Sequence, residues 1–312
     1  MTRSFNQKAQ SALSKMGVAT LFTVALVAFA TIFASCNNAT GENNKTPSTY
    51  TVDGINFTMK DIAAVTDGML GHNDAENNKP HKVSLSAYRI GETEVTQELW
   101  KAVMGSNPSG FGDKPDGNEV QEKRPIERVS WYSCIVFCNE LTKKINGSDM
   151  ECVYTFQGKT YGKEEAEAER KPEMNMAKKG FRLPTEAEWE WAAMGGQDHK
   201  WAGVNDIDKL SDYAWIKVNS NAKTHEVKKK QPNGYGLYDM SGNVSEWCWD
   251  GYDDLPNPME KDYAGPSLEG PHVFHGGNWK EDDADGSAHA TRDARDPDDG
   301  DNDLGLRLAL RL

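Results

Sequence analysis

Apolar residues recur at helical spacing in three places, and each place follows a residue that commonly caps a helix. The first segment runs from Thr96 to Gly105, the second follows Ser130, and the third follows Thr185. A serine or threonine at the N-cap accepts a backbone amide hydrogen bond, and glycine ends a helix in the left-handed conformation. Glu188 completes a capping box with Thr185. The pattern therefore predicts three helices.

Elsewhere the pattern is typical of short strands. Apolar and polar residues alternate over 50–59 and 81–88, and 152–156 with 159–161 form a hairpin pattern around Gln157-Gly158. Residues 162–179 are a charged insert that we expect on the surface, and from Asn233 onward short strands alternate with glycine turns. Without internal repeats, this predicts an irregular α+β fold with few helices and many short strands and loops.

The N-terminus has the features of a bacterial lipoprotein signal. Three basic residues precede an apolar run over 16–33, small residues precede Cys36, and a polar stretch follows over 37–49. We expect 1–35 to be the signal peptide, Cys36 to carry the lipid, 36–49 to be a polar linker and 50–312 to fold as one domain. An uncleaved membrane anchor is the alternative, because 18 apolar residues nearly span a bilayer. Either reading places the domain outside the cytoplasm.

The acidic composition limits the classes of partner. The net charge is −13, and it becomes −16 when residues 1–35, with three positive charges and no acidic residue, are removed. Such a surface repels phosphate backbones and anionic headgroups. We therefore expect no nucleic-acid partner, attachment to the membrane through the N-terminal lipid alone, and a monomer.

The C-terminal stretch 280–303 contains no Val, Ile, Leu, Met, Phe, Tyr, Trp or Cys. From Glu281 to Asp303 it holds ten acidic residues against Arg292 and Arg295, a formal charge of −8. A segment that cannot bury apolar area is expected to face water. It has no thiol and no serine paired with a base, so we interpret it as a displayed surface.

Cysteine and tryptophan positions favour a core role. Cys134 and Cys138 are four apart in a helical pattern, where disulfide geometry is poor, and we expect them, like Cys152 and Cys248, to be core thiols. A disulfide to Cys152 remains open, since the compartment is oxidising. We interpret the motif tryptophans as core residues and not as sugar-binding platforms, namely Trp189, Trp191, Trp247 and Trp249.

Two longer motifs resemble a known family. Phe181–Ala193 and Asn233–Trp247 resemble hallmarks of the formylglycine-generating enzyme (sulfatase-modifying factor) family, and Gly276-Gly277-Asn278-Trp279 falls in the expected order after them. The resemblance covers about Thr58 to Leu308. It implies a C-type-lectin-like α+β fold.

The family's catalytic residues are not carried over. The enzymes use a cysteine pair shortly after the Gly-Gly motif to bind copper and oxidise a substrate cysteine. The matching positions here are Glu281 and Gly286, and neither supplies the thiolate that this chemistry needs. We therefore expect no enzyme activity and no catalytic cofactor.

The acidic stretch resembles the variable region of proteins diversified by a retroelement, such as variable lipoproteins of treponemes. Every residue from Asp282 to Asp303 is Asn or is reached from an Asn codon by changing its first two bases; an ordinary Asp/Gly/Ser/Asn loop is the alternative. This resemblance makes 276–308 a variable region. Its candidate ligand-binding side chains are Asn278, Lys280, Glu281, Asp282, Asp283, Asp285, Ser287, His289, Asp293, Asp296, Asp298, Asp301 and Asp303.

The family resemblance also implies a structural calcium ion. Its ligands would be Asp239 and Glu246 with the carbonyls of Gly242 and Val244, and a capped turn without metal is the alternative. An EF-hand beginning at Glu281 is excluded, because Arg292 stands where a bidentate glutamate is required.

We thus expect a non-catalytic, surface-displayed lipoprotein of the cell envelope that binds an unidentified protein or other ligand of basic character. The alternatives are an enzyme of the sulfatase-modifying type and a structural lipoprotein of the envelope.

Overall fold

The computed structural model describes residues 48–112, 117–266, 268–282 and 284–312. The predicted signal peptide, the lipidation site Cys36 and the candidate Asp283 lie outside the described residues. Within these ranges, no helix has the length and apolarity needed to cross a membrane.

The three predicted helices are confirmed with their caps. They are α1 (Gln97–Met104), α2 (Trp131–Asn146) and α4 (Glu186–Met194), with N-caps at Thr96, Ser130 and Thr185. Each ends at a glycine in the left-handed conformation, and the capping box of α4 is present. The sequence did not predict the shorter helical pieces, which are α3 (Lys163–Glu167), η1 (Gln121–Lys123), η2 (Ile207–Asp212) and η3 (Ala284–Ser287).

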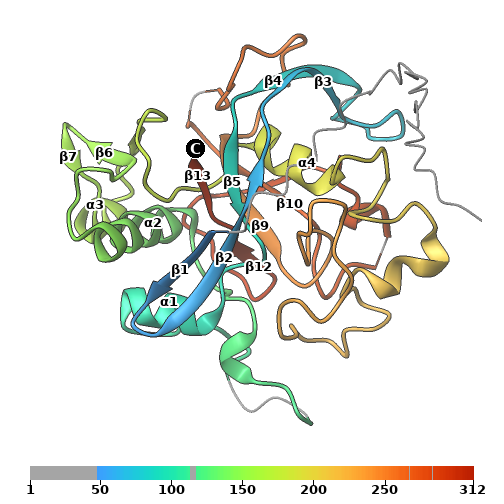
Figure 1. Ribbon diagram of the computed structural model, residues 1–312, viewed down its shortest axis with the longest axis horizontal. Helices are drawn as coiled ribbons and strands as arrows, with labels where there is room; N and C mark the ends of the chain where they lie inside the picture. Colours follow the sequence, from blue (N-terminus) through green and yellow to red (C-terminus); the bar gives the residue numbers. More distant parts are fainter. Residues whose placement is uncertain (1–47, 113–116, 267, 283) are drawn as a thin grey trace, which may run out of the picture. The chain divides into compact units, whose positions relative to one another are not determined.

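The first sheet joins the two ends of the domain. Its strand order is β1 (Ser48–Val52), β2 (Ile55–Ile62), β5 (Tyr88–Gly91) and β13 (Ala309–Arg311), all antiparallel (Figure 1). The expected single strand over 50–59 is wrong, because Asp53 and Gly54 both have positive φ and turn the chain into a hairpin. β1 also begins inside the expected linker.

The second sheet supports the acidic stretch 280–303, which we call the acidic segment. Its order is β11 (Asp293–Arg295), β10 (His272–His275), β9 (Ser245–Gly251) and β12 (Leu304–Leu306). β9 is buried along its whole length, as expected for a central strand, and β12 pairs with it in parallel. The acidic segment leaves this sheet after β10 and returns to it in β11 and β12, so both of its ends are fixed.

Two small sheets complete the fold. One pairs β3 (Val65–Leu70) with β4 (His81–Leu85), and the other has the order β7 (Lys159–Thr160), β6 (Tyr154–Phe156) and β8 (Glu173–Met174). The expected strand over 81–88 is divided between β4 and β5. The expected hairpin at Gln157-Gly158 is confirmed. The predicted α+β class is therefore correct.

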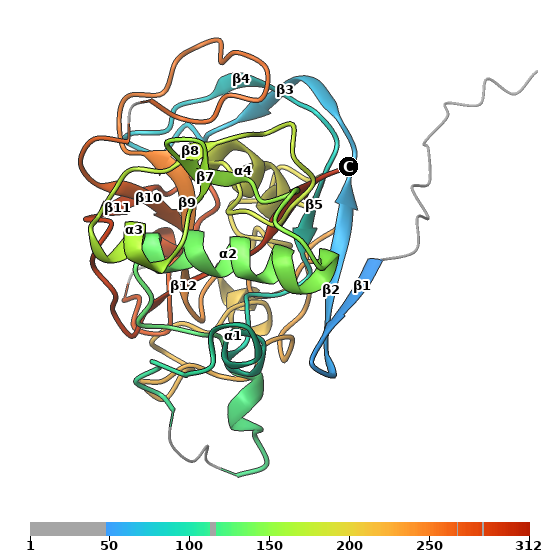
Figure 2. The same cartoon turned by 90° about the vertical axis from the view of Figure 1, so that its left-hand side faces the viewer.

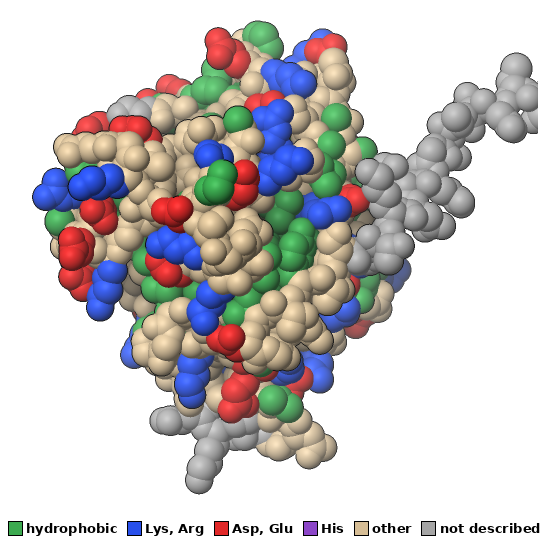
Figure 3. All heavy atoms as spheres, turned by 60° about the vertical axis from the view of Figure 1, so that its left-hand side comes forward, with side chains coloured by type: hydrophobic (Ala, Val, Ile, Leu, Met, Phe, Trp, Pro, Cys, Tyr) green, Lys and Arg blue, Asp and Glu red, His purple; other side chains and the backbone are tan. Residues whose placement is uncertain are grey.

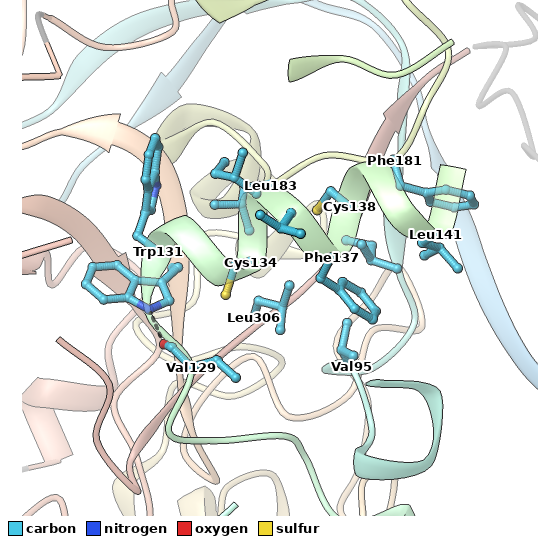
Figure 4. Close-up of a cluster of buried hydrophobic side chains, with 14 of the residues drawn as sticks. Val95, Val129, Trp131, Cys134, Phe137, Cys138, Leu141, Phe181, Leu183 and Leu306 are labelled. Carbon is cyan, nitrogen blue, oxygen red and sulfur yellow. Dashed lines mark hydrogen bonds between the residues drawn. The ribbon is translucent and has the colours of Figure 1, made fainter. Parts of the chain in front are cut away.

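The main core forms around α2. Figure 4 shows Trp131, Cys134, Phe137 and Leu141 of this helix packed among side chains from other elements, including Leu183 and Leu306. In Figure 2 the helix runs in front of the second sheet, and the indole of Trp131 donates a 2.9 Å hydrogen bond to the carbonyl of Cys248 in β9. All four described cysteines are buried and free, as expected of core thiols.

The surface carries both signs of charge. On the face shown in Figure 3, acidic and basic side chains are interspersed, with hydrophobic atoms visible between them. The tryptophan prediction holds for Trp189, Trp247 and Trp249, which are at most 5 % exposed. Trp191 departs from it: this side chain is only partly buried and lines a surface cavity.

Candidate functional site

The acidic segment is preceded by two glycines at positions where a side chain would not fit. Gly276 and Gly277 follow β10 with φ of 95° and 63°, and a Cβ on Gly277 would lie 2.5 Å from Oγ of Ser287. L-residues rarely adopt such angles, and the contact leaves no room for a side chain. The Gly-Gly motif therefore lets the following loop fold back against the end of the sheet.

Two carboxylates on one face of α4 hold the middle of the segment. Arg292 donates to both oxygens of Glu186, from Nε at 2.6 Å and from Nη2 at 2.9 Å. Four residues along the helix, Oε1 of Glu190 lies 3.1 Å from Nδ1 of His289. All four side chains are at most 3 % exposed. Residues four apart share a helix face, so α4 presents two anchors to the segment.

The electrostatics of Glu186 reflect this pairing. Burial by itself raises the pKa of its carboxyl, but the hydrogen bonds and charges of His275 and Arg292 outweigh burial, and the net pKa is lowered. Burial also raises the pKa of the Glu190 carboxyl, but the hydrogen bond and the charge of His289 outweigh burial, and the net pKa of Glu190 is lowered. Both glutamates are therefore held ionised beneath the segment.

A third ion pair closes the end of the segment. Arg295 donates to both oxygens of Asp303, at 3.0 and 3.1 Å, and the ammonium of Lys280 lies 2.8 Å from the same carboxylate. The indole of Trp279 donates a 2.9 Å hydrogen bond to the carbonyl of Asn302. The beginning and end of the acidic segment are thus fastened to each other.

A cavity of about 400 Å³ opens above the Gly-Gly turn. It is lined by Ser245, Phe274, His275, Gly276, Gly277, Asn278, Lys280, Glu281, Asp282, Gly286, Thr291, Asp293, Arg295 and Asp303. Glu281 and Gly286 are neighbours in it, because a Cβ on Gly286 would lie 2.3 Å from Cδ of Glu281. The two positions that match the family's cysteine pair are therefore juxtaposed, and a carboxylate occupies the space between them.

The expectation that the whole acidic stretch 280–303 faces water is wrong for three candidates, and the preceding candidate Asn278 is buried as well. Asn278, Ser287, His289 and Asp303 are at most 6 % exposed. Three of them have polar partners: the amide of Asn278 donates to Oγ of Ser245 at 3.1 Å, His289 lies beside Glu190, and Asp303 accepts from Arg295. The hydroxyl of Ser287 is buried without a hydrogen-bond partner among the described residues. Buried polar groups need such partners, and a sequence pattern does not show them.

The remaining described candidates lie at the surface. Lys280, Asp282, Asp285, Asp293, Asp296, Asp298 and Asp301 are exposed, and Glu281 is half-buried. Asp282 pairs with Lys217, Asp285 with Lys200 at 2.5 Å, and Asp301 approaches Lys280 at 3.7 Å. Among the residues that the structure describes, no ion pair involves Asp293, Asp296, Asp298 or the adjacent Asp299. We call these four the free aspartates.

The turn expected to bind calcium is occupied by an arginine. Arg307 is fully buried and donates to both oxygens of Glu246, with distances of 2.7–3.0 Å, while the indole of Trp189 donates to Glu246 at 2.6 Å. Gly242 lies on the backbone of Trp215, where a Cβ would be 2.3 Å from the carbonyl oxygen. Glu246 is thus already paired with a cation and Gly242 serves a close backbone contact.

Two further carboxylates lie in the same buried cluster. Burial raises the pKa of Asp239 to about 6. Burial, followed by the charges of Asp239 and Glu246, raises the pKa of Glu94 well above its usual range. In the described part of the chain, no group of three or more His, Cys, Asp or Glu side chains is placed to hold a metal ion. Calcium bound by Asp239, Gly242, Val244 and Glu246 does not fit this arrangement.

Sequence reasoning missed the anchoring residues. Arg292 and Arg295 are the only basic residues between Glu281 and Asp303, and both are engaged with buried or partly buried carboxylates. Glu186 and Glu190 stand four apart on a helix otherwise rich in apolar residues. Isolated cations in an acidic loop and acidic pairs on a buried helix face were the available signals.

Comparisons with known proteins agree with the observed fold. Among solved structures, the fold is similar to Treponema denticola variable protein 1, with 49% identity, a TM-score of 0.79, and coverage of 86% of this chain and 100% of that chain. A protein of Paenibacillus barcinonensis named chaperone protein LppX is 34% identical over 229 residues, 65% of this chain and 76% of that protein.

A catalytic relative is also similar. The formylglycine-generating enzyme of Streptomyces coelicolor is 32% identical over 151 residues, which is 42% of this chain and 46% of the enzyme. The family described as sulfatase-modifying factor enzyme 1-like domain matches residues 36–312, and the resemblance inferred from the sequence motifs is therefore confirmed. This chain belongs to the sulfatase-modifying factor enzyme 1-like domain family.

Proposed function

We propose that the protein is a non-catalytic binding protein whose acidic C-terminal segment forms the ligand-binding surface. The observation that carries this proposal is the cavity at the Gly-Gly turn, where Glu281 and Gly286 occupy the positions of the family's cysteine pair. The similarity to a treponemal variable protein supports it. The buried anchors on α4 support it too, because they fix the backbone while the free aspartates remain exposed at the surface.

The ligand is expected to be basic. The free aspartates are four exposed carboxylates without ion pairs in the described structure, on a domain with a strong negative charge. Complementary charge accelerates association and makes it salt-dependent. A lysine- or arginine-rich protein segment has the chemistry that this surface would recognise.

Replacing the free aspartates with asparagine tests the binding surface. Their side chains are exposed and make no ion pair among the described residues, and asparagine at 293 can still accept the hydrogen bond from the amide of Ala294. Each change should therefore alter the free energy of unfolding by under about 0.5 kcal/mol. Binding to an array of lysine- and arginine-rich peptides should weaken roughly tenfold or more, because contact energy is concentrated in few side chains. Thermal melting and array binding are measured separately.

The matched control removes four exposed carboxylates elsewhere in the domain, by changing Glu164, Glu169, Glu173 and Glu260 to Gln. If binding depends on the position of the charges, this variant retains it. Equal losses in both variants would mean that net charge alone attracts the peptides. Unfolding of the free-aspartate variant would assign a structural role to the segment.

The competing function is oxidation of a substrate cysteine to formylglycine. We expect no aldehyde from a sulfatase-type cysteine peptide with copper and oxygen supplied, because no thiolate is present at positions 281 and 286. Mass spectrometry of the peptide provides the measurement, and the Streptomyces coelicolor enzyme is the positive control. Aldehyde above background would contradict the proposal and show that the protein is an enzyme.

We further propose that the protein is displayed on the cell envelope through a lipid on Cys36. The motif around Cys36 supports this. Cys36→Ala should abolish incorporation of a labelled fatty acid and either release the protein or stall its processing. The control Cys152→Ala removes a buried thiol and should keep the label. Full membrane retention of Cys36→Ala with the apolar run intact would indicate a transmembrane anchor.

A further inference from the structure

A second cavity lies between the end of β3 and α4, outside the acidic segment. Its volume is about 540 Å³, within the usual range for small-molecule sites. It is lined by Met69, Leu70, Gly71, His72, Asn73, Pro80, Trp191, Met194, Gly196, Gln197, Asp198 and Tyr235. In Figure 1 these elements, β3 and α4, lie side by side. We call this the β3–α4 cavity.

The wall of the β3–α4 cavity is fixed by the same glutamate that anchors the acidic segment. Oε1 of Glu190 accepts a hydrogen bond from the amide of Gly71 at 2.8 Å, and Oε2 accepts one from the side chain of Asn78 at 2.9 Å. The loop after β3 is therefore tied to α4. A pre-formed cavity lowers the entropic cost of binding.

The cavity combines aromatic rings with polar groups that have no partner inside the protein. Among the described residues, no hydrogen bond involves the indole N–H of Trp191, the hydroxyl of Tyr235, or the side chains of Asn73, Gln197 and Asp198. Both rings are only partly buried. In the cavity at the Gly-Gly turn, by contrast, Asp303 and Arg295 are engaged with each other. The polar groups of the β3–α4 cavity are thus available to a ligand.

We propose that the β3–α4 cavity binds a neutral saccharide. Amide side chains both donate and accept hydrogen bonds, as sugar hydroxyls do, and a carboxylate accepts from two hydroxyls. The ring faces of Trp191 and Tyr235 offer apolar area to the C–H face of a pyranose. No Lys or Arg lines the cavity, so an anionic ligand lacks a counter-charge, and a fully apolar ligand would leave the polar groups unpaired.

The position of the cavity places this site near the acidic segment. His72 lines the β3–α4 cavity and also a small neighbouring cavity of about 40 Å³ that is lined by Asp285, His289 and Thr291. Thr291 in turn lines the cavity at the Gly-Gly turn. The β3–α4 cavity and the candidate binding surface are therefore neighbours, and a glycosylated partner would contact both sites.

The test uses the purified full chain in a polyoxyethylene detergent, which carries no sugar headgroup. It is applied to an array of neutral mono- and oligosaccharides, including glucose, galactose, mannose and N-acetylglucosamine, and the best-bound sugar is then titrated by calorimetry. Gln197→Ala and Trp191→Ala should each weaken binding about tenfold or more. Gln231→Ala is the matched control, because Gln231 is exposed and is not among the residues that line the cavity, and it should leave affinity within about twofold.

Gln197 keeps the test decisive if Trp191→Ala does not fold, since the Gln197 side chain is exposed and melting checks its variant. The free-aspartate variant should bind the sugar normally, which separates this site from the acidic surface. Absence of binding to every saccharide, or undiminished affinity in Gln197→Ala, would overturn the proposal. Binding of tetramethylammonium without any saccharide would overturn it too, in favour of a cation held by the aromatic rings.

Discussion

Replacing Arg307 with alanine should lower the free energy of unfolding by about 3–5 kcal/mol, because it removes one partner of a fully buried ion pair. The guanidinium reaches Glu246 and also the carbonyls of Gly91 and Tyr238, both within 2.9 Å. Without it, the carboxylates of Glu246, Glu94 and Asp239 share one buried cluster with no central cation. Urea unfolding of the folded domain measures the loss.

Two further variants serve as controls for Arg307→Ala. Arg311→Ala removes an exposed arginine that makes one 3.1 Å hydrogen bond to the carbonyl of Met176, and it should cost under about 0.5 kcal/mol. Arg307→Lys keeps the charge but cannot match the planar fork, so its stability should lie between the wild type and Arg307→Ala. A stability of Arg307→Ala within about 1 kcal/mol of the wild type would show that the cluster does not need the cation.

Replacing Arg292 with alanine should destabilise the domain by about 3 kcal/mol or more, although Arg292 belongs to a polar surface segment. The change leaves Glu186 buried with His275 as its remaining partner, beside Asp250, whose pKa burial and then Glu186 raise well above its usual range. Urea unfolding gives the global loss, and amide exchange in β11 reports loosening of the segment.

Arg295→Ala is the control, because Arg295 lies at the end of β11, three residues after Arg292. Its side chain is 27 % exposed, and Lys280 remains beside Asp303 as a cationic partner after the change, so the loss should be about 1 kcal/mol. Equal effects of the two variants would contradict the assignment of Arg292 as the principal anchor. The comparison therefore separates the fixed part of the acidic segment from the part available for binding.

Local signals in the sequence determined much of the fold. The caps at Thr96, Ser130 and Thr185 act within a few residues, and the helices begin where they predict. The strands were less predictable, because alternation continues through the Asp53-Gly54 turn. Motifs of the family then indicated the α+β architecture, and the absence of thiols at 281 and 286 is visible in the sequence itself.

Only the tertiary structure decided which residues of the acidic segment face water. Composition shows only that a segment has no apolar side chains to bury. Polar side chains can still be buried when a distant element supplies a hydrogen-bond partner, as α4 does for His289 and Arg292. The same reason explains why the calcium site expected from the sequence does not fit the structure. Asp239 and Glu246 have oxygens suited to calcium, but Arg307, which lies between β12 and β13, contacts Glu246 and supplies the positive charge there.

The β3–α4 cavity shows the same division between sequence and structure. The sequence predicts Trp191 to be a core residue because it lies in a helix motif with Trp189, and Trp189 is fully buried. The sequence determined the helix, its caps and its apolar residues. Which side of that helix remains open was decided by packing between segments distant in the chain, since burial depends on every neighbour in space and periodicity reports only neighbours along the chain.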